Sequence, residues 1–216
     1  DYSTTGCTID IPNNILDMLE IPTFFNALGF DVNKGASTKN LTKFKSFIQF
    51  VLSKPNMLVS FRNDGSLESY TNCYGQLDAG IHKIPDGGFF IQLDSKPNVV
   101  NKLIGVNLAC DMIDMRLKHM NYEEYLNKLI LVFESLMVEE NYRFRFFPHI
   151  LSDMKIIYDL LSKMSDYNVK YNVEVMPYLT GQGYEQEIYA KYFECEVITG
   201  MRFHTNVCCS GVCRPP

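Results

Sequence analysis

Residues 121–140 read NYEEYLNKLILVFESLMVEE, and this stretch carries the clearest structural signal in the chain. Asn121, with Glu124 three residues later, forms a capping box of the kind that opens a helix. Apolar residues then recur every three or four positions, which predicts a helix with a buried stripe. That stripe consists of Leu126, Leu129, Phe133 and Leu136. Apolar Ile130 lies off the stripe, so we expect this helix to be buried on more than one side.

Two flanking segments show the same spacing and extend the prediction to a helical core over residues 98–165. Asn98 is the expected cap of a long helix that continues to Met120. Pro148 suits the first turn of a third helix, which ends near Met164. Three long apolar helices are enough to build a core.

Strand-like patterns precede and follow this helical core. In residues 57–95 short apolar runs alternate with turn residues such as Asn63-Asp64-Gly65, which predicts hairpins. Over residues 168–209 apolar and polar residues alternate, as in half-buried antiparallel strands. With N-terminal helices expected over residues 9–54, this order predicts an α+β fold. We expect antiparallel hairpins packed against a cluster of apolar helices in a single compact domain, residues 1–216.

Composition limits the classes of function. The 216 residues are 46% hydrophobic and carry a formal net charge of −5, which excludes a disordered chain. An acidic chain makes a nucleic-acid partner unexpected, because such binding depends on Lys and Arg. No apolar run approaches the ~18 residues that a membrane span needs. The first residue is Asp1 rather than Met, which indicates a processed protein, a polyprotein fragment or a trimmed chain, and the 17 Asn beside 5 Ala suggest a viral or parasite source.

Seven cysteines are placed unevenly, with three of them in the last nine residues. We expect disulfides among six of them in an oxidising compartment. These six are Cys7, Cys73, Cys195, Cys208, Cys209 and Cys213. Cys110, on a predicted helix stripe, is the expected free thiol, and an unpaired cysteine could join two chains. The sequon Asn40-Leu41-Thr42 makes Asn40 a glycosylation candidate and agrees with secretion.

Two alternatives for the cysteines stay open. One is a reduced cytosolic protein whose cysteines pack as small apolar residues. The other is a zinc site at His204, Cys208, Cys209 and Cys213, although the usual Cys-x2-Cys knuckle is missing. Neither a metal nor another cofactor is the favoured expectation.

Two patterns carry possible catalytic chemistry. Pro85-Asp86 followed by Asp94-Ser95-Lys96 is similar to a PD-(D/E)xK nuclease signature, in which carboxylates hold a metal. His82 could add a ligand. Cys73 could instead act as a nucleophile with a histidine base, for which His82, His119, His149 and His204 are the candidates. No flanking residues are diagnostic of either enzyme.

The segment of Tyr142, Arg143, Phe144 and Arg145 combines aromatic and Arg residues, as protein interfaces do. The sequence therefore favours a non-enzymatic binding or structural protein with a protein partner. It would be disulfide-stabilised, secreted or exposed on a cell or virion surface. The metal-dependent nuclease and a cytosolic interaction domain with reduced thiols are the alternatives.

Overall fold

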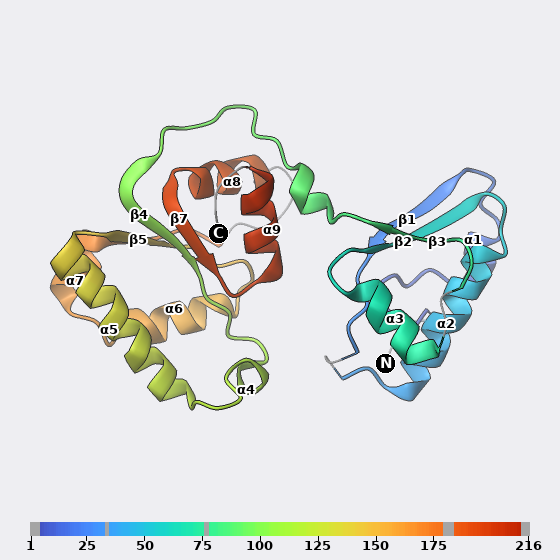
Figure 1. Ribbon diagram of the computed structural model, residues 1–216, viewed down its shortest axis with the longest axis horizontal. Helices are drawn as coiled ribbons and strands as arrows, with labels where there is room; N and C mark the ends of the chain where they lie inside the picture. The colour runs from blue at the N-terminus through green and yellow to red at the C-terminus, as the bar shows by residue number, and fades with distance from the viewer. Residues whose placement is uncertain (1–4, 33–34, 76–77, 179–183, 213–216) are drawn as a thin grey trace. The chain divides into compact units, whose positions relative to one another are not determined.

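The computed structural model describes residues 5–32, 35–75, 78–178 and 184–212, and Figure 1 shows its helices and strands. The chain divides into two compact units, Asp1–Gly87 and Gly88–Pro216, which we call unit 1 and unit 2. Each unit has its own sheet. A single compact domain was predicted, whereas the hydrophobic residues gather in separate cores within the two units.

Unit 1 alternates strands with helices around a three-stranded sheet. Its elements are α1 (Asn13–Leu16), β1 (Thr23–Leu28), α2 (Thr38–Leu52), β2 (Met57–Arg62), α3 (Ser66–Tyr74) and β3 (Ile81–Ile84), and the 3-10 helix η2 (Gly87–Phe90) follows. The strands are parallel in the order β1-β2-β3. Helix α2 begins where the Ser37 side chain accepts a hydrogen bond from the backbone N–H of Asn40. Its buried face packs on β2.

Unit 2 repeats this alternation around a four-stranded sheet. Its elements are β4 (Val100–Asn107), α4 (Ile113–Arg116), α5 (Tyr122–Glu140), β5 (Arg143–Phe146), α6 (Asp153–Leu161), α7 (Asp166–Asn172), β6 (Val173–Val175), α8 (Glu185–Phe193), β7 (Cys195–Gly200) and α9 (Phe203–Gly211). All neighbouring strands are parallel, in the order β6-β5-β4-β7. The chain moves outward from β4 to β6 and then returns to the other side of β4. This is the order of a doubly wound sheet.

Helices cover both faces of the unit 2 sheet (Figure 1). On one face Phe144 of β5 packs against Phe133 of α5, with ring centroids 4.6 Å apart. On the other face Leu103 of β4 lies in a separate cluster with Tyr192 of α8 and Cys209 of α9. A strand between two such layers has a nearly continuous apolar run, as residues 103–106 of β4 do.

The predicted α+β fold with antiparallel hairpins is wrong, because every strand pair among the described residues is parallel and the strands alternate with helices. Unit 2 is α/β. The largest single error is the helix predicted from Asn98 to Met120, where β4 lies. Residues at helical spacing in a short apolar run do not distinguish a buried helix from a strand covered on both faces.

Two other segments that were predicted within helical regions are strands, namely Thr23–Leu28 (β1) in residues 9–54 and Arg143–Phe146 (β5) in residues 98–165. Further errors concern segments that were predicted as strands. Residues 66–74 form α3, which is capped at both ends by glycines with positive φ, Gly65 and Gly75. Residues 166–172 form α7, since the Ser165 side chain accepts a hydrogen bond from Asn168 N–H and starts a helix. After β7 the chain enters α9 instead of returning as a strand. The predicted helices over residues 38–52, 122–140 and 153–161 are confirmed.

None of the helices in the described part of the chain combines the length and the apolar character needed to cross a membrane.

Candidate functional site in unit 2

The carboxyl ends of β4, β5 and β7 form the candidate site. From β4 the chain leads to one side of the sheet, and β7 lies on the opposite side of β4. Such a switch point leaves a crevice at the carboxyl ends of the strands, where ligands bind in open α/β sheets. The segments that follow these strand ends contribute Asp111, His149, Asp153 and Arg202.

Asn107, the last residue of β4, ties the three strand ends together. Its buried side-chain amide donates a hydrogen bond to the Phe147 carbonyl oxygen, at 2.8 Å, and its Oδ1 accepts one from Arg202 N–H, at 3.2 Å. Its backbone carbonyl oxygen accepts from Met201 N–H at 3.0 Å. These bonds hold the segment that carries Arg202 against β4 and β5.

Arg202 is clamped by two carboxylates. Its Nε donates to Asp153 Oδ2 at 2.9 Å and its Nη2 to Asp153 Oδ1 at 2.5 Å. Nη2 also donates to Asp111 Oδ1 at 2.7 Å. No described residue accepts a hydrogen bond from Nη1. The hydrogen bonds to Asp153 are the main cause that raises the pKa of Arg202, so its positive charge is permanent.

Asp153 is fully buried at the start of α6. Burial by itself would raise the pKa of its carboxyl group. The hydrogen bonds from Arg202 and from the backbone N–H groups of His149 and Ile150 outweigh burial, so the pKa of Asp153 lies below its usual value. Asp153 is therefore an anion that fixes both the arginine and the loop after β5.

His149 lies beside this pair in a hydrogen-bonded group of uncharged side chains. Its Nε2 is 2.7 Å from the Tyr192 hydroxyl and 3.5 Å from the Thr205 hydroxyl. The Tyr192 ring stacks on Phe147 with centroids 3.7 Å apart. Burial, with Arg202 and His204 as further positive neighbours, lowers the pKa of His149 to about 4 despite the opposing effect of Asp153. His149 is therefore neutral at neutral pH.

The turn from β7 into α9 places the helix start at the same site. A Cβ atom on Gly200 would lie 2.5 Å from Thr205 Cγ2, so the turn has no room for a larger residue. Helix α9 begins directly after Arg202, so the positive end of its dipole lies next to the guanidinium. His204, in the first turn, is exposed.

The protein should lose stability on acidification, because His149 is buried in its neutral form. The pKa of His149 is about 4 in the folded protein and 6.5 ordinarily. The contribution of the neutral imidazole to the free energy of unfolding is therefore complete above pH 6.5 and is lost as the pH falls toward 4. Going from about pH 7.5 to about pH 5 should lower the free energy of unfolding by about 2 kcal/mol. Urea titrations at both pH values measure this. His149→Gln should remove most of the difference and His119→Gln, at an exposed position, should retain it; equal pH dependence in all three proteins would contradict the prediction.

None of the described cysteines forms a disulfide, so the predicted disulfides at Cys7, Cys73, Cys195, Cys208 and Cys209 are wrong. Cys195 of β7 and Cys208 and Cys209 of α9 are buried, and they fill the core as small apolar side chains. Cys110 is also free, as expected. Cys213 lies outside the described residues. Within the described part of the chain, no group of three or more His, Cys, Asp or Glu side chains could hold a metal ion.

The nuclease-like residues are divided between the two units. In unit 1 Asp86 is buried and accepts a hydrogen bond from Arg62 Nη1 at 3.2 Å, while His82 is exposed. In unit 2 the backbone N–H of Asp94 donates to Gln186, and Lys96 lies over the Phe193 ring. The set is thus distributed over separate local networks.

The predicted interface segment forms β5 inside unit 2. Phe144 is buried, and Arg145 is buried with its guanidinium 2.6 Å from both Glu174 and Glu194. Tyr142 and Arg143 are partly buried at the start of the strand. Glycosylation candidate Asn40 is on α2, with its Oδ1 buried. Its side chain lines a cavity of about 270 Å³ with Phe30 and Arg62.

Sequence reasoning named His149 only as a base for Cys73, which belongs to unit 1, and His204 as such a base or as a zinc ligand. It missed Asn107, Asp153 and Arg202 altogether. A usable signal was present, since each of these polar residues follows closely after a short apolar run, where the carboxyl end of a parallel strand would be.

The strand order and the two covered faces define unit 2 as a doubly wound α/β unit, and the polar cluster at the carboxyl edge of its sheet is the candidate ligand site. Residues 12–216 match the family model described as polysaccharide pyruvyl transferase. The chain belongs to the polysaccharide pyruvyl transferase family.

A search of curated proteins finds no match to the chain. Among solved structures, the crystal structure of TarM matches with a TM-score of 0.43 and 17% sequence identity. The match covers 80% of this chain and 29% of the TarM chain. This chain therefore spans about 29% of the length of that protein.

Family membership corrects the functional prediction. A non-enzymatic, disulfide-stabilised viral or parasite binding protein is wrong, because the family is one of enzymes named for a transfer to polysaccharide. Family membership likewise contradicts the two alternative predictions, a nuclease and a cytosolic interaction domain. Secretion or surface exposure and a protein partner stay predictions.

Proposed function

We propose that the chain forms part of an enzyme that transfers a pyruvyl group to a saccharide, and that unit 2 binds the activated donor. Family membership supports the reaction class. The observation that supports a donor site in unit 2 is Arg202, a cation at the switch point of the sheet that two carboxylates hold in place.

The reaction determines what the donor must look like. Two sugar hydroxyls form bonds to C2 of an enolpyruvyl group, while the bond from C2 to its phosphate oxygen breaks. One hydroxyl proton ends on C3, which becomes a methyl group, and the other leaves with inorganic phosphate. Atoms and charges balance for an enolpyruvyl phosphate donor, which carries a carboxylate and a phosphate. A donor site therefore needs fixed positive charge and N–H donors.

Arg202 fits that requirement. The two carboxylates bind Nε and Nη2, which fixes the plane of the guanidinium. Nη1 then remains with two N–H groups that can donate to anionic oxygens of the donor. The start of α9 adds a favourable potential for the same anion.

The two histidines take different roles in this proposal. His149, neutral and hydrogen-bonded to Tyr192, positions the loop after β5 and keeps a second positive charge away from Arg202. His204 is exposed in the first turn of α9, and we assign to it the transfer of protons between the acceptor hydroxyl and the donor.

The test is transfer itself. The protein is incubated with enolpyruvyl phosphate and hexose oligosaccharides. The ketal product is detected by its methyl signal in proton NMR, and the released inorganic phosphate is measured alongside it. Saturation-transfer NMR measures donor binding without an acceptor. The proposal predicts donor binding that inorganic phosphate displaces; a protein that neither binds the donor nor releases phosphate contradicts it.

A further inference from the structure

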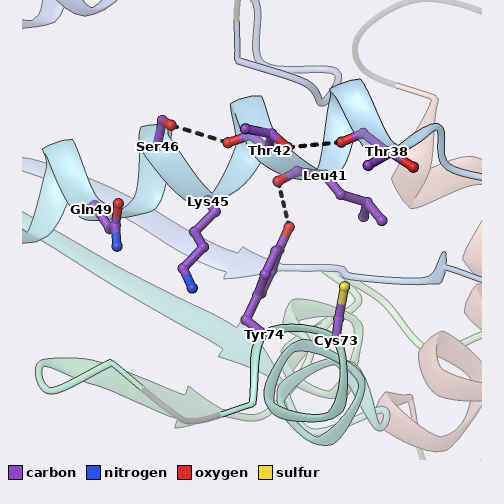
Figure 2. A pocket seen from close by; sticks show the side chains of 8 residues that line it. All are labelled: Thr38, Leu41, Thr42, Lys45, Ser46, Gln49, Cys73 and Tyr74. Atoms are coloured by element: carbon purple, nitrogen blue, oxygen red, sulfur yellow. Dashed lines mark hydrogen bonds between the residues drawn. The ribbon is translucent and has the colours of Figure 1, made fainter.

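Unit 1 contains a pocket of about 440 Å³ between α2 and the end of α3 (Figure 2). Its volume lies in the range of about 300–1,000 Å³ that holds small ligands. Figure 2 shows Cys73 and Tyr74 rising from α3 toward α2, and Lys45 of α2 extending beside the Tyr74 ring. The sequence and family assignment leave this pocket without a role.

The polar side chains of α2 that line the pocket are mostly hydrogen-bond acceptors. Thr42 and Ser46 each donate their hydroxyl proton to a carbonyl oxygen one turn earlier in α2, at 3.0 and 3.1 Å. Their oxygen lone pairs remain as acceptors, and the exposed amide of Gln49 offers both a donor and an acceptor. A row of acceptors with an amide suits a ligand rich in hydroxyl groups.

The charge of the pocket is positive. The described residues that line it include Lys45 and no carboxylate. Lys45 Nζ lies 5.2 Å from the centroid of the Tyr74 ring, and no described carboxylate forms an ion pair with it. In a chain of net charge −5, a cation that is not paired with any described carboxylate favours an anionic ligand.

Tyr74 fixes the remaining wall. Its hydroxyl donates to the Leu41 carbonyl oxygen at 2.7 Å, and its ring packs on Tyr70 with centroids 4.7 Å apart. Burial raises the pKa of Tyr74 to about 12, so this wall is a neutral aromatic ring at physiological pH. The ring edge and the Lys45 stem give an apolar surface next to the cation.

We propose that this pocket binds a saccharide that carries a carboxylate, with Lys45 pairing with the carboxylate and the α2 side chains accepting hydrogen bonds from the sugar hydroxyls. The inference rests on the proposed function, because a pyruvyl ketal is a carboxylate on a sugar. The pocket is then a second glycan site, which holds already modified segments of the polysaccharide while unit 2 binds donor.

The exposed Cys73 thiol on the pocket wall provides the readout. The probe is an oligosaccharide bearing pyruvate ketals, and iodoacetamide labelling of Cys73 is followed by peptide mass spectrometry. At several times the dissociation constant, the probe should slow labelling about fivefold, since bound protein is shielded. The same oligosaccharide after removal of its ketals by mild acid, and free pyruvate, should give little protection.

Substitutions separate this site from its alternatives. Lys45→Gln should abolish protection and Lys45→Arg should retain it, which distinguishes lost charge from lost folding. Lys43→Gln, on the same helix but outside the pocket lining, is the matched control. Arg202→Gln should also retain protection, so failure of the proposed transfer leaves this test valid. Equal protection by ketal-free oligosaccharide or by pyruvate, protection that survives in Lys45→Gln, or none with any probe, overturns the proposal.

Discussion

Arg202→Gln is expected to lower kcat/KM for enolpyruvyl phosphate by at least about a hundredfold, which is the usual loss when a preorganised donor to a developing anion is removed. Glutamine keeps much of the side-chain length but removes the positive charge and the planar fork. The donor then meets Asp111 and Asp153, which are no longer neutralised. The variant should therefore bind the donor more weakly and stabilise the departing phosphate less.

Arg202→Lys distinguishes charge from geometry. Lysine restores a cation but cannot bind Asp153 through two parallel hydrogen bonds and still offer a pair of N–H groups to the donor. We expect it to recover only a small part of the lost activity. Steady-state kinetics with the donor varied measures both proteins.

The matched control for these variants is Arg143→Gln. Arg143 is a partly exposed arginine of β5, 3.9 Å from Glu174, and does not contact the Arg202 cluster. It should keep wild-type kinetics. Activity of Arg202→Gln within threefold of wild type, in a protein with unchanged circular dichroism, would place the donor elsewhere.

How far the sequence predicts this molecule depends on the kind of signal. Helices with a side-chain cap and a long stripe were predictable, as at Asn121, whose Oδ1 accepts a hydrogen bond from Glu124 N–H. Strand β4 was not, because its residues 103–106 are apolar on both faces and show no alternation to detect. The strands were also predicted to pair antiparallel instead of parallel, since α3 and α9 were interpreted as returning strands of hairpins.

The candidate site was less predictable still. Arg202 and Asp153 are 49 residues apart, and neither has a neighbour in sequence that marks it as functional. They meet because β5 and β7 flank β4 in parallel, which brings the segments after all these strands to one edge. A site made by topology becomes visible only when the strand order is known.

Asp153→Ala is expected to lower the free energy of unfolding by about 3–5 kcal/mol, since removing the fully buried partner of an ion pair leaves Arg202 with only the partly exposed Asp111 as its carboxylate. Asp153 is fully buried, and its carboxylate accepts hydrogen bonds from His149 N–H and Ile150 N–H as well as from Arg202. Alanine leaves both backbone N–H groups and the Nε of Arg202 without this acceptor, while Nη2 of Arg202 keeps its bond to Asp111. Urea denaturation at neutral pH measures the loss.

Two comparisons show whether the loss comes from Arg202. Asp166→Ala removes an acidic residue from the same first-turn position of an exposed helix, α7, and should cost less than about 1 kcal/mol. In the double variant Asp153→Ala/Arg202→Ala, the stranded guanidinium is gone as well. Its cost should therefore fall below the sum of the two single costs by about 1–3 kcal/mol. Additive costs would mean that Asp153 stabilises the loop after β5 independently of the arginine, and the donor site would then lack the clamp that fixes its cation.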